Sequence, residues 1–176
     1  MGHITVTEKV AAPVEAVFAY VDDHRNTTAY MKDLTRWEPA GPVTHGKGAT
    51  FAVAMKAGPL TLASVVDITT WTENRAIGWT SREGFRQTGR WSFAKAGDGT
   101  EATFDMEYEL PGGMAGRVLS RAAEPIVRGN IQQSVRNLAS RVERSARTPA
   151  AAGRSRGAKA SAKATKAVSK PASRKR

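Results

Sequence analysis

The side chains that could orient or act on a small molecule are a few tryptophans, tyrosines and serines within an alternating apolar pattern. Between residues 51 and 110, polar atoms on the apolar face belong to Ser64, Trp79, Ser81, Trp91 and Tyr108. Buried Trp and Tyr usually need a hydrogen-bond partner, so these groups could orient a ligand. Tyr108, with Tyr30 second, is a weak candidate for acid–base catalysis, because no carboxylate or histidine is paired with it in the pattern.

The sequence does not predict a reactive cysteine, a metal site or a phosphate-binding loop. The chain has no cysteine, which excludes disulfides and thiolate chemistry. His3, His24 and His45 are scattered without metal-ligand spacing, so we predict no metal and no cofactor. Residues 41–47 have the spacing of a phosphate-binding loop, but Gly48 stands where Ser or Thr should bind magnesium, and a strand follows instead of a helix.

The longest predicted element is a helix from Met114 to Arg144. Its second half places five apolar residues on one face, namely Val127, Ile131, Val135, Leu138 and Val142. An earlier apolar stripe, formed by Met114, Val118, Ala122 and Ile126, points about half a turn away. Because Pro125 lies between the two stripes, we expect a kink or a break there.

The preceding chain predicts one strand, two short helices and about six further strands. His3 to Val10 alternates as a strand, Pro13 opens a helix, and a second short helix is expected near residues 26–34. From Thr35 onward the apolar period is two. The order of elements indicates an α+β fold, in which a curved antiparallel sheet of six to seven strands wraps around the long C-terminal helix.

The last hairpin gives a prediction of register. Residues 97–99, Gly-Asp-Gly, form a strong hairpin signal. When the apolar faces of its strands are matched, Arg90 lies opposite Asp105 or Glu107, which would stabilise the pair modestly.

Several of these stretches resemble a known superfamily. They are residues 12–18 (Ala-Pro-Val-Glu-Ala-Val-Phe) with Asp23, residues 66–68 with Trp71, residues 97–100, and the terminal helix. The chain resembles the START-like, or helix-grip, superfamily in its polyketide cyclase/dehydrase and lipid-transport branch, the SRPBCC proteins. The resemblance covers residues 1 to about 144. It implies the helix-grip fold and a cavity between sheet and terminal helix for a hydrophobic ligand.

The alternation, taken with this implied cavity, predicts the lining. The predicted ligand-binding residues are Phe51, Val53, Met55, Leu62, Ser64, Val66, Ile77, Trp79, Ser81, Trp91, Phe93, Phe104, Met106, Tyr108, Ile131 and Val135. Tyr30 and Trp37 would lie at the mouth of the cavity or pack against the first helix. No charged residue is among them, so the ligand should be neutral or weakly polar. The alternative is that the same residues fill a solid core.

Three functions remain open from the sequence. The first is binding or carriage of a small hydrophobic molecule that is polyketide-, lipid- or sterol-like. The second is an enzyme of the polyketide cyclase/dehydratase type, since some members of the resembled family place acid–base groups in the cavity. The third is an accessory protein tethered to nucleic acid or an anionic membrane.

The positive charge is concentrated at the C-terminal end. The net charge is +11 from 27 Lys+Arg and 16 Asp+Glu, and ten of the basic residues, with no acidic one, follow Arg144. We therefore divide the chain into a helix-grip domain, residues 1–146, and a disordered Lys/Arg/Ala-rich tail, residues 147–176. The tail could bind nucleic acid or another anionic surface without reading sequence, through Lys159, Lys163, Lys166, Lys170, Arg174, Lys175 and Arg176. A solubilising extension is the alternative.

The sequence also bears on location. It shows no secretory signal at its start and no apolar run near the roughly 20 residues that a membrane span needs. We therefore expect a cytoplasmic protein with no transmembrane segment.

Overall fold

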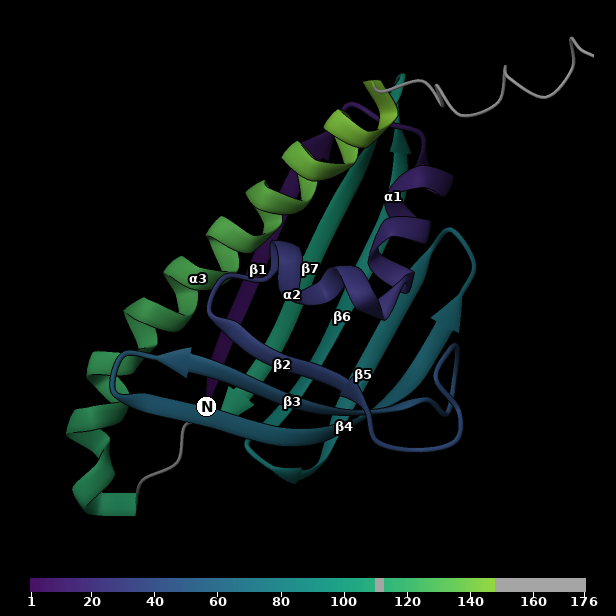
Figure 1. Ribbon diagram of the computed structural model, residues 1–176. Coiled ribbons are helices and arrows are strands. Elements are labelled where there is room, and N and C mark those ends of the chain that lie inside the picture. Colours follow the sequence, from purple (N-terminus) through teal and green to yellow (C-terminus); the bar gives the residue numbers. More distant parts are fainter. Residues whose placement is uncertain (110–112, 148–176) are drawn as a thin grey trace, which may run out of the picture.

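The computed structural model describes residues 1–109 and the backbone of 113–147, with side chains from Ala123 onward. Its centre is a strongly curved sheet of seven antiparallel strands, with helices on the concave side (Figure 1). The strand order is β1-β7-β6-β5-β4-β3-β2. This is the predicted α+β helix-grip fold. No helix within the described ranges is long and apolar enough to cross a membrane.

The elements follow the predicted order of strand, short helices, six strands and long helix. They are β1 (Gly2–Val10), α1 (Val14–Asp22), the 3-10 helix η1 (His24–Asn26), α2 (Thr27–Tyr30), β2 (Leu34–Pro39), β3 (Thr50–Ala57), β4 (Leu60–Thr72), β5 (Ala76–Gly84), β6 (Arg86–Ala96), β7 (Gly99–Glu109) and α3 (Gly113–Arg147). The second helix is shorter than predicted, because α2 ends at Tyr30 and β2 begins at Leu34.

Alternation along the strands decides which side chains enter the core. On β7, Phe104, Met106 and Tyr108 are buried, whereas Glu107 and Glu109 are exposed. The β6–β7 hairpin pairs Arg90 with Asp105, which is the first of the two predicted registers. The outer face of the sheet is therefore polar, and its concave face is apolar and aromatic.

Helix α3 packs its predicted apolar face against the sheet. Val127, Ile131, Val135, Leu138 and Val142 are each at most 2% exposed. Full burial of such a side chain stabilises a protein by about 1.5–3 kcal/mol. This stripe, together with Ile4 of β1, forms a filled part of the core.

Pro125 lies inside α3, and the helix continues through it from Gly113 to Arg147. A break at Pro125, one of the two expected outcomes, is therefore wrong. Figure 1 shows the first turns tilted against the rest of the helix, as an interior proline would produce. Ile126, from the earlier stripe, is exposed. The other three side chains of that stripe lie outside the described residues.

The short helices are tied to α3 by polar contacts. The Ser134 hydroxyl accepts a hydrogen bond from the Lys32 backbone N–H at 2.8 Å and donates to the carbonyl of Asn130 at 2.6 Å. Asn137 Nδ2 donates to the Tyr30 carbonyl at 3.2 Å. These bonds hold α2 against one side of α3, so that α1, η1 and α2 cover a different part of the sheet from α3.

Candidate functional site

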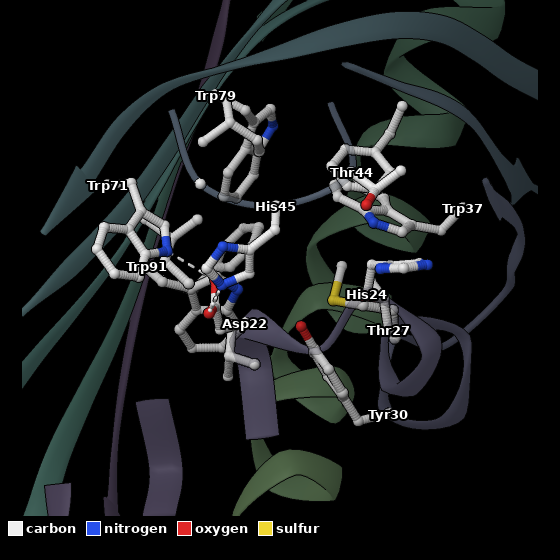
Figure 2. Close-up of a pocket in the computed structure, with 17 residues that line it drawn as sticks. Asp22, His24, Thr27, Tyr30, Trp37, Thr44, His45, Trp71, Trp79 and Trp91 are labelled. Atoms are coloured by element: carbon white, nitrogen blue, oxygen red, sulfur yellow. Dashed lines mark hydrogen bonds and ion pairs between the residues drawn. The ribbon is translucent and has the colours of Figure 1, made fainter. Parts of the chain in front are cut away.

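A cavity lies between the concave face of the sheet and the short helices (Figure 2). Its volume is about 60 Å³ when only positions open to the centre of a water-sized molecule are counted, and about 580 Å³ when all space free of atoms is counted, open solvent included. Its lining comes from α1, η1, α2, the loop after β2 and the strands β2 to β7. No described residue of α3 lines it. The cavity thus lies beside the terminal helix, not between sheet and helix as predicted, because the apolar stripe of α3 already fills the space beneath it.

The walls of the cavity are aromatic. All four tryptophans of the chain line it, namely Trp37, Trp71, Trp79 and Trp91. Trp37 stacks on Phe51 with ring centroids 5.3 Å apart, and Trp91 meets Phe104 edge-on at 5.0 Å. Such contacts hold the rings in fixed orientations, so much of the wall is formed before any ligand binds.

Gly89 sets the position of Trp79. A Cβ at residue 89 would collide with the Trp79 indole, so only glycine lets the ring lie flat over β6. The indole Nε1 donates to Gln87 Oε1 at 3.3 Å.

One end of the cavity carries a carboxylate with two nitrogen donors. Asp22, the last residue of α1, accepts a hydrogen bond from Trp71 Nε1 at 2.7 Å through one oxygen. Its other oxygen lies 2.6 Å from His45 Nε2. His45 also meets the Trp71 ring edge-on, with centroids 5.4 Å apart. A carboxylate accepts only, so an ionised Asp22 requires a proton on His45 Nε2, and in the neutral imidazole Nδ1 then keeps its lone pair.

The loop between β2 and β3 brings His45 to this end. Gly46 and Gly48 adopt positive φ angles of 73° and 91°, which other residues rarely adopt. The loop is fastened to β4, because Gly48 N–H donates to the Ile68 carbonyl and Ile68 N–H donates to the Ala49 carbonyl, both at 2.8 Å. His45 is therefore held over the cavity by backbone hydrogen bonds as well as by Asp22.

Tyr30 projects its hydroxyl into the cavity from α2 (Figure 2). The residue is buried, and burial raises the pKa of its hydroxyl, although the polar groups of Thr27 and Trp91 beside it lower the pKa in part. The hydroxyl therefore stays protonated at neutral pH and can donate a hydrogen bond. Tyr30 and Trp37 both line the cavity.

The structure brings only part of the predicted lining together. Five predicted ligand-binding residues line this cavity: Phe51, Ile77, Trp79, Trp91 and Phe104. The other eleven lie elsewhere, buried or half-buried: Val53, Met55, Leu62, Ser64, Val66, Ser81, Phe93, Met106, Tyr108, Ile131 and Val135. Alternation identifies the concave face correctly, but it does not say which part of that face a helix fills.

The predicted serines are engaged by the protein itself. Gln87 Nε2 donates to the Ser64 hydroxyl at 3.0 Å, and Gln87 N–H donates to the Ser81 hydroxyl at 2.9 Å. Together with the bond from Trp79, Gln87 therefore satisfies three of the polar groups that the sequence offered for orienting a ligand.

Tyr108, the first catalytic candidate, is not among the residues that line the cavity. Its hydroxyl is buried and has no hydrogen-bond partner among the described residues. Burial, and next the charge of Glu124, raise the pKa of this hydroxyl. Phe85 lies beside its ring, and a Cβ at Gly2 would collide with it. Tyr108 thus lies apart from Asp22 and His45.

Sequence reasoning missed the polar residues of the site. Asp22, His24, His45 and Trp71 line the cavity, although none was predicted to bind a ligand. Asp22 and His45 are 23 positions apart, on a helix and a loop, so no spacing rule connects them. A glycine-rich loop carrying a histidine was the available signal. Within the described part of the chain, no group of three or more His, Asp or Glu side chains could hold a metal ion.

The predicted anion-binding residues of the tail, from Lys159 to Arg176, lie outside the described residues. α3 ends at Arg147, one residue beyond the predicted end of the domain. The proposed division at residue 146 stays a prediction.

The chain was also compared with known protein families and with curated proteins. The model of the family described as polyketide cyclase/dehydrase and lipid transport matches residues 1–143. No curated protein matches the chain.

Solved structures share the fold at low sequence identity. The protein TTHA0849 from Thermus thermophilus is 21% identical, with 84% of this chain and 100% of that chain covered and a TM-score of 0.72. A START superfamily protein from Mycobacterium smegmatis is 18% identical, with 81% and 97% covered and a TM-score of 0.64. The Zhui aromatase/cyclase from Streptomyces sp. R1128 is 19% identical, with 84% and 96% covered and a TM-score of 0.63. At these identities the likeness shows the fold alone.

Proposed function

Because this chain belongs to the polyketide cyclase/dehydrase and lipid transport family, we propose that it binds a small hydrophobic molecule in the cavity beneath its short helices. The observation that carries the proposal is the gathering of all four tryptophans around one cavity. A protein that needed these rings only for its core would pack them without leaving space between them. Concave, largely apolar sites with a few placed polar groups are typical of small-molecule binding.

The size of the cavity limits what it can enclose. A water molecule needs about 10–15 Å³ by the same kind of measure, so a cavity of 60 Å³ by that measure suits about one ring or a short acyl segment. A polyketide- or sterol-like molecule would place one end there and extend through the open mouth.

The test combines native mass spectrometry with a matched pair of substitutions. Protein purified from its own source should carry a bound apolar mass that disappears after extraction with organic solvent. Trp37→Ala removes a half-buried wall residue and should reduce retention of this ligand at least about tenfold. Phe85→Ala removes a half-buried aromatic that does not line the cavity, and should leave retention unchanged. Equal retention by both variants would contradict the proposal.

A second candidate function is acid–base catalysis on a hydrophobic ketone, of the cyclase/dehydratase type. It is favoured by the Asp22–His45 contact of 2.6 Å at the cavity end and by the protonated Tyr30 hydroxyl in the lining. His45 Nδ1 would take a proton from the carbon next to the carbonyl, and the C–H electrons would form an enolate. The Tyr30 hydroxyl would donate a hydrogen bond to the enolate oxygen.

This candidate is tested by hydrogen–deuterium exchange of 2-tetralone in D₂O, followed by NMR. The protein should accelerate exchange next to the carbonyl, and His45→Gln should abolish the acceleration. His3→Gln is the control, since His3 also lies against a carboxylate, Asp105, at 2.9 Å, but on the outer face of the sheet. If His45→Gln matches the wild type, the catalytic candidate is wrong and the binding function is untouched.

A further inference from the structure

The lining of the cavity carries one charge. Asp22 is its only acidic residue, and none of the described lining residues is Lys or Arg, so with neutral histidines the formal charge is −1. The Asp22 side chain is only 16% exposed. This corrects the expectation, based on the predicted lining, that the site holds no charged group.

Asp22 has acceptor positions left beside the two hydrogen bonds that it accepts. A carboxylate offers about four acceptor positions, and the hydrogen bonds from Trp71 and His45 occupy two of them, one on each oxygen. Both donors are uncharged when His45 is neutral, so they orient the carboxylate without cancelling its charge. A ligand cation would add the missing positive charge in a partly dry site, where the attraction is stronger than in water.

The walls favour the same kind of ligand. The faces of tryptophan rings carry negative potential and attract cations, and tryptophan does so most strongly of the aromatic side chains. Trp71, which holds Asp22, and three further tryptophans surround the cavity (Figure 2). A carboxylate-bearing ligand would meet Asp22 and these faces with the wrong sign of charge.

We propose that the ligand is an amine attached to a small apolar ring, with the ring among the tryptophans and the protonated nitrogen beside Asp22. This inference rests on the proposed binding function and narrows it to one class of ligand. It also assigns Asp22 as the residue that selects the charge of the ligand.

The test uses three molecules that share a phenyl ring and a two-carbon spacer: phenethylamine, 2-phenylethanol and 3-phenylpropionate. Binding to the full chain is measured at pH 8 from the change in tryptophan fluorescence excited at 295 nm. All four tryptophans report on the cavity. The amine should bind about tenfold more tightly than the alcohol, a difference of about 1.4 kcal/mol. The carboxylate should bind more weakly than the alcohol.

Two variants identify the source of the preference. Asp22→Asn keeps the size of the side chain and should bring the amine to the affinity of the alcohol. Asp98→Asn, the same change in the exposed turn between β6 and β7, should leave the tenfold preference intact. Thermal melts of both variants show whether each is folded, and the comparison of the three molecules on the wild type needs no variant.

The outcomes separate this inference from the binding function. Equal affinity of amine and alcohol for the wild type would overturn the amine preference while supporting a hydrophobic site. A preference that survives in Asp22→Asn would overturn the assignment of Asp22. If none of the three molecules changes the fluorescence, both the amine inference and the enclosed hydrophobic site are contradicted.

Discussion

One concave face of the sheet is covered in two different ways. Under α3 the side chains of Ile131, Val135 and Leu138 are at most 1% exposed, and no described residue of this helix borders the cavity. Under α1, η1, α2 and the β2–β3 loop, the same face leaves a cavity lined by aromatic rings. We call these the packed half and the cavity half.

The cover explains the difference. α3 has 35 residues and presents an apolar stripe from Val127 to Val142, whereas α1, η1 and α2 have nine, three and four residues. Short helices end in turns whose backbone groups need polar partners, so they cannot press a continuous ridge into the sheet. The largely buried carboxylate of Asp22 and the exposed ring of His45 meet at the edge of the cavity on this side, and function is expected there.

The largest expected change is in the free energy of unfolding when one isoleucine from each half is replaced by alanine. Ile131→Ala should lower the free energy of unfolding by about 2–5 kcal/mol, because the filled surroundings cannot close the new hole. Ile68→Ala should cost less, since its side chain borders space that already lacks partner atoms. Urea unfolding followed by circular dichroism measures both values. Equal losses at the two positions would mean that the halves do not differ in packing.

A smaller loss of stability is expected from removing the hydrogen bond between Ser134 of α3 and the chain after α2, where the two halves meet. Ser134→Ala leaves the Lys32 N–H without its acceptor and should cost about 1–3 kcal/mol. Ser145→Ala changes an exposed serine of the same helix and should stay within about 0.5 kcal/mol. Denaturant unfolding of the two variants gives the comparison. A loss at Ser134 no larger than at Ser145 would contradict a structural role for this bond.

Acid should weaken the cavity half modestly through Asp23, which caps η1. Its hydrogen bonds from Arg25 lower its pKa from 3.8 to about 2, so the ionised form is favoured in the folded protein. The resulting stability is present above about pH 4 and is lost as the pH falls towards 2. Because the pair is exposed, the effect is small.

The contribution of ionised Asp23 can be checked from melting temperatures, measured for the wild type and for Arg25→Gln at pH 6 and pH 2. The variant should melt slightly lower at pH 6 and together with the wild type at pH 2. A difference that persists unchanged at pH 2 would show that Asp23 ionisation is not its source.

The smallest expected effect is that of removing the basic tail. Truncation at Thr148 should leave the melting temperature nearly unchanged, since both halves lie before it. If the tail binds nucleic acid, DNA retention at low salt should fall on truncation, and retention by the full chain should decline steeply with salt. A large fall in melting temperature would contradict the division into domain and tail.

The fold was predictable from the sequence because periodicity reports which side of an element is buried. The stripe from Val127 to Val142, the Arg90–Asp105 register and the order of elements all follow from local patterns. Alternation also identified Trp79 and Trp91 as interior residues. The cavity itself depends on how well a distant helix covers each strand, and alternation carries no information on that.

The contact between Asp22 and His45 could not be predicted from the sequence, because it also depends on how distant elements are arranged. Asp22 belongs to no motif found in the sequence, and His45 lies in a stretch, residues 41–47, that only imitates a phosphate-binding loop. Only the curl of the sheet brings the loop of His45 over the end of α1, so their contact is a property of the whole fold.

The most direct test is to identify the side chains that a bound ligand contacts. NMR of the isotope-labelled full chain with 2-phenylethanol would give intermolecular NOEs from the phenyl ring. We predict NOEs to the indole protons of Trp37, Trp71, Trp79 and Trp91, with none to the methyl groups of Ile131, Val135 or Leu138. NOEs to those methyl groups, without contacts to the indoles, would place the ligand in the packed half and contradict the account.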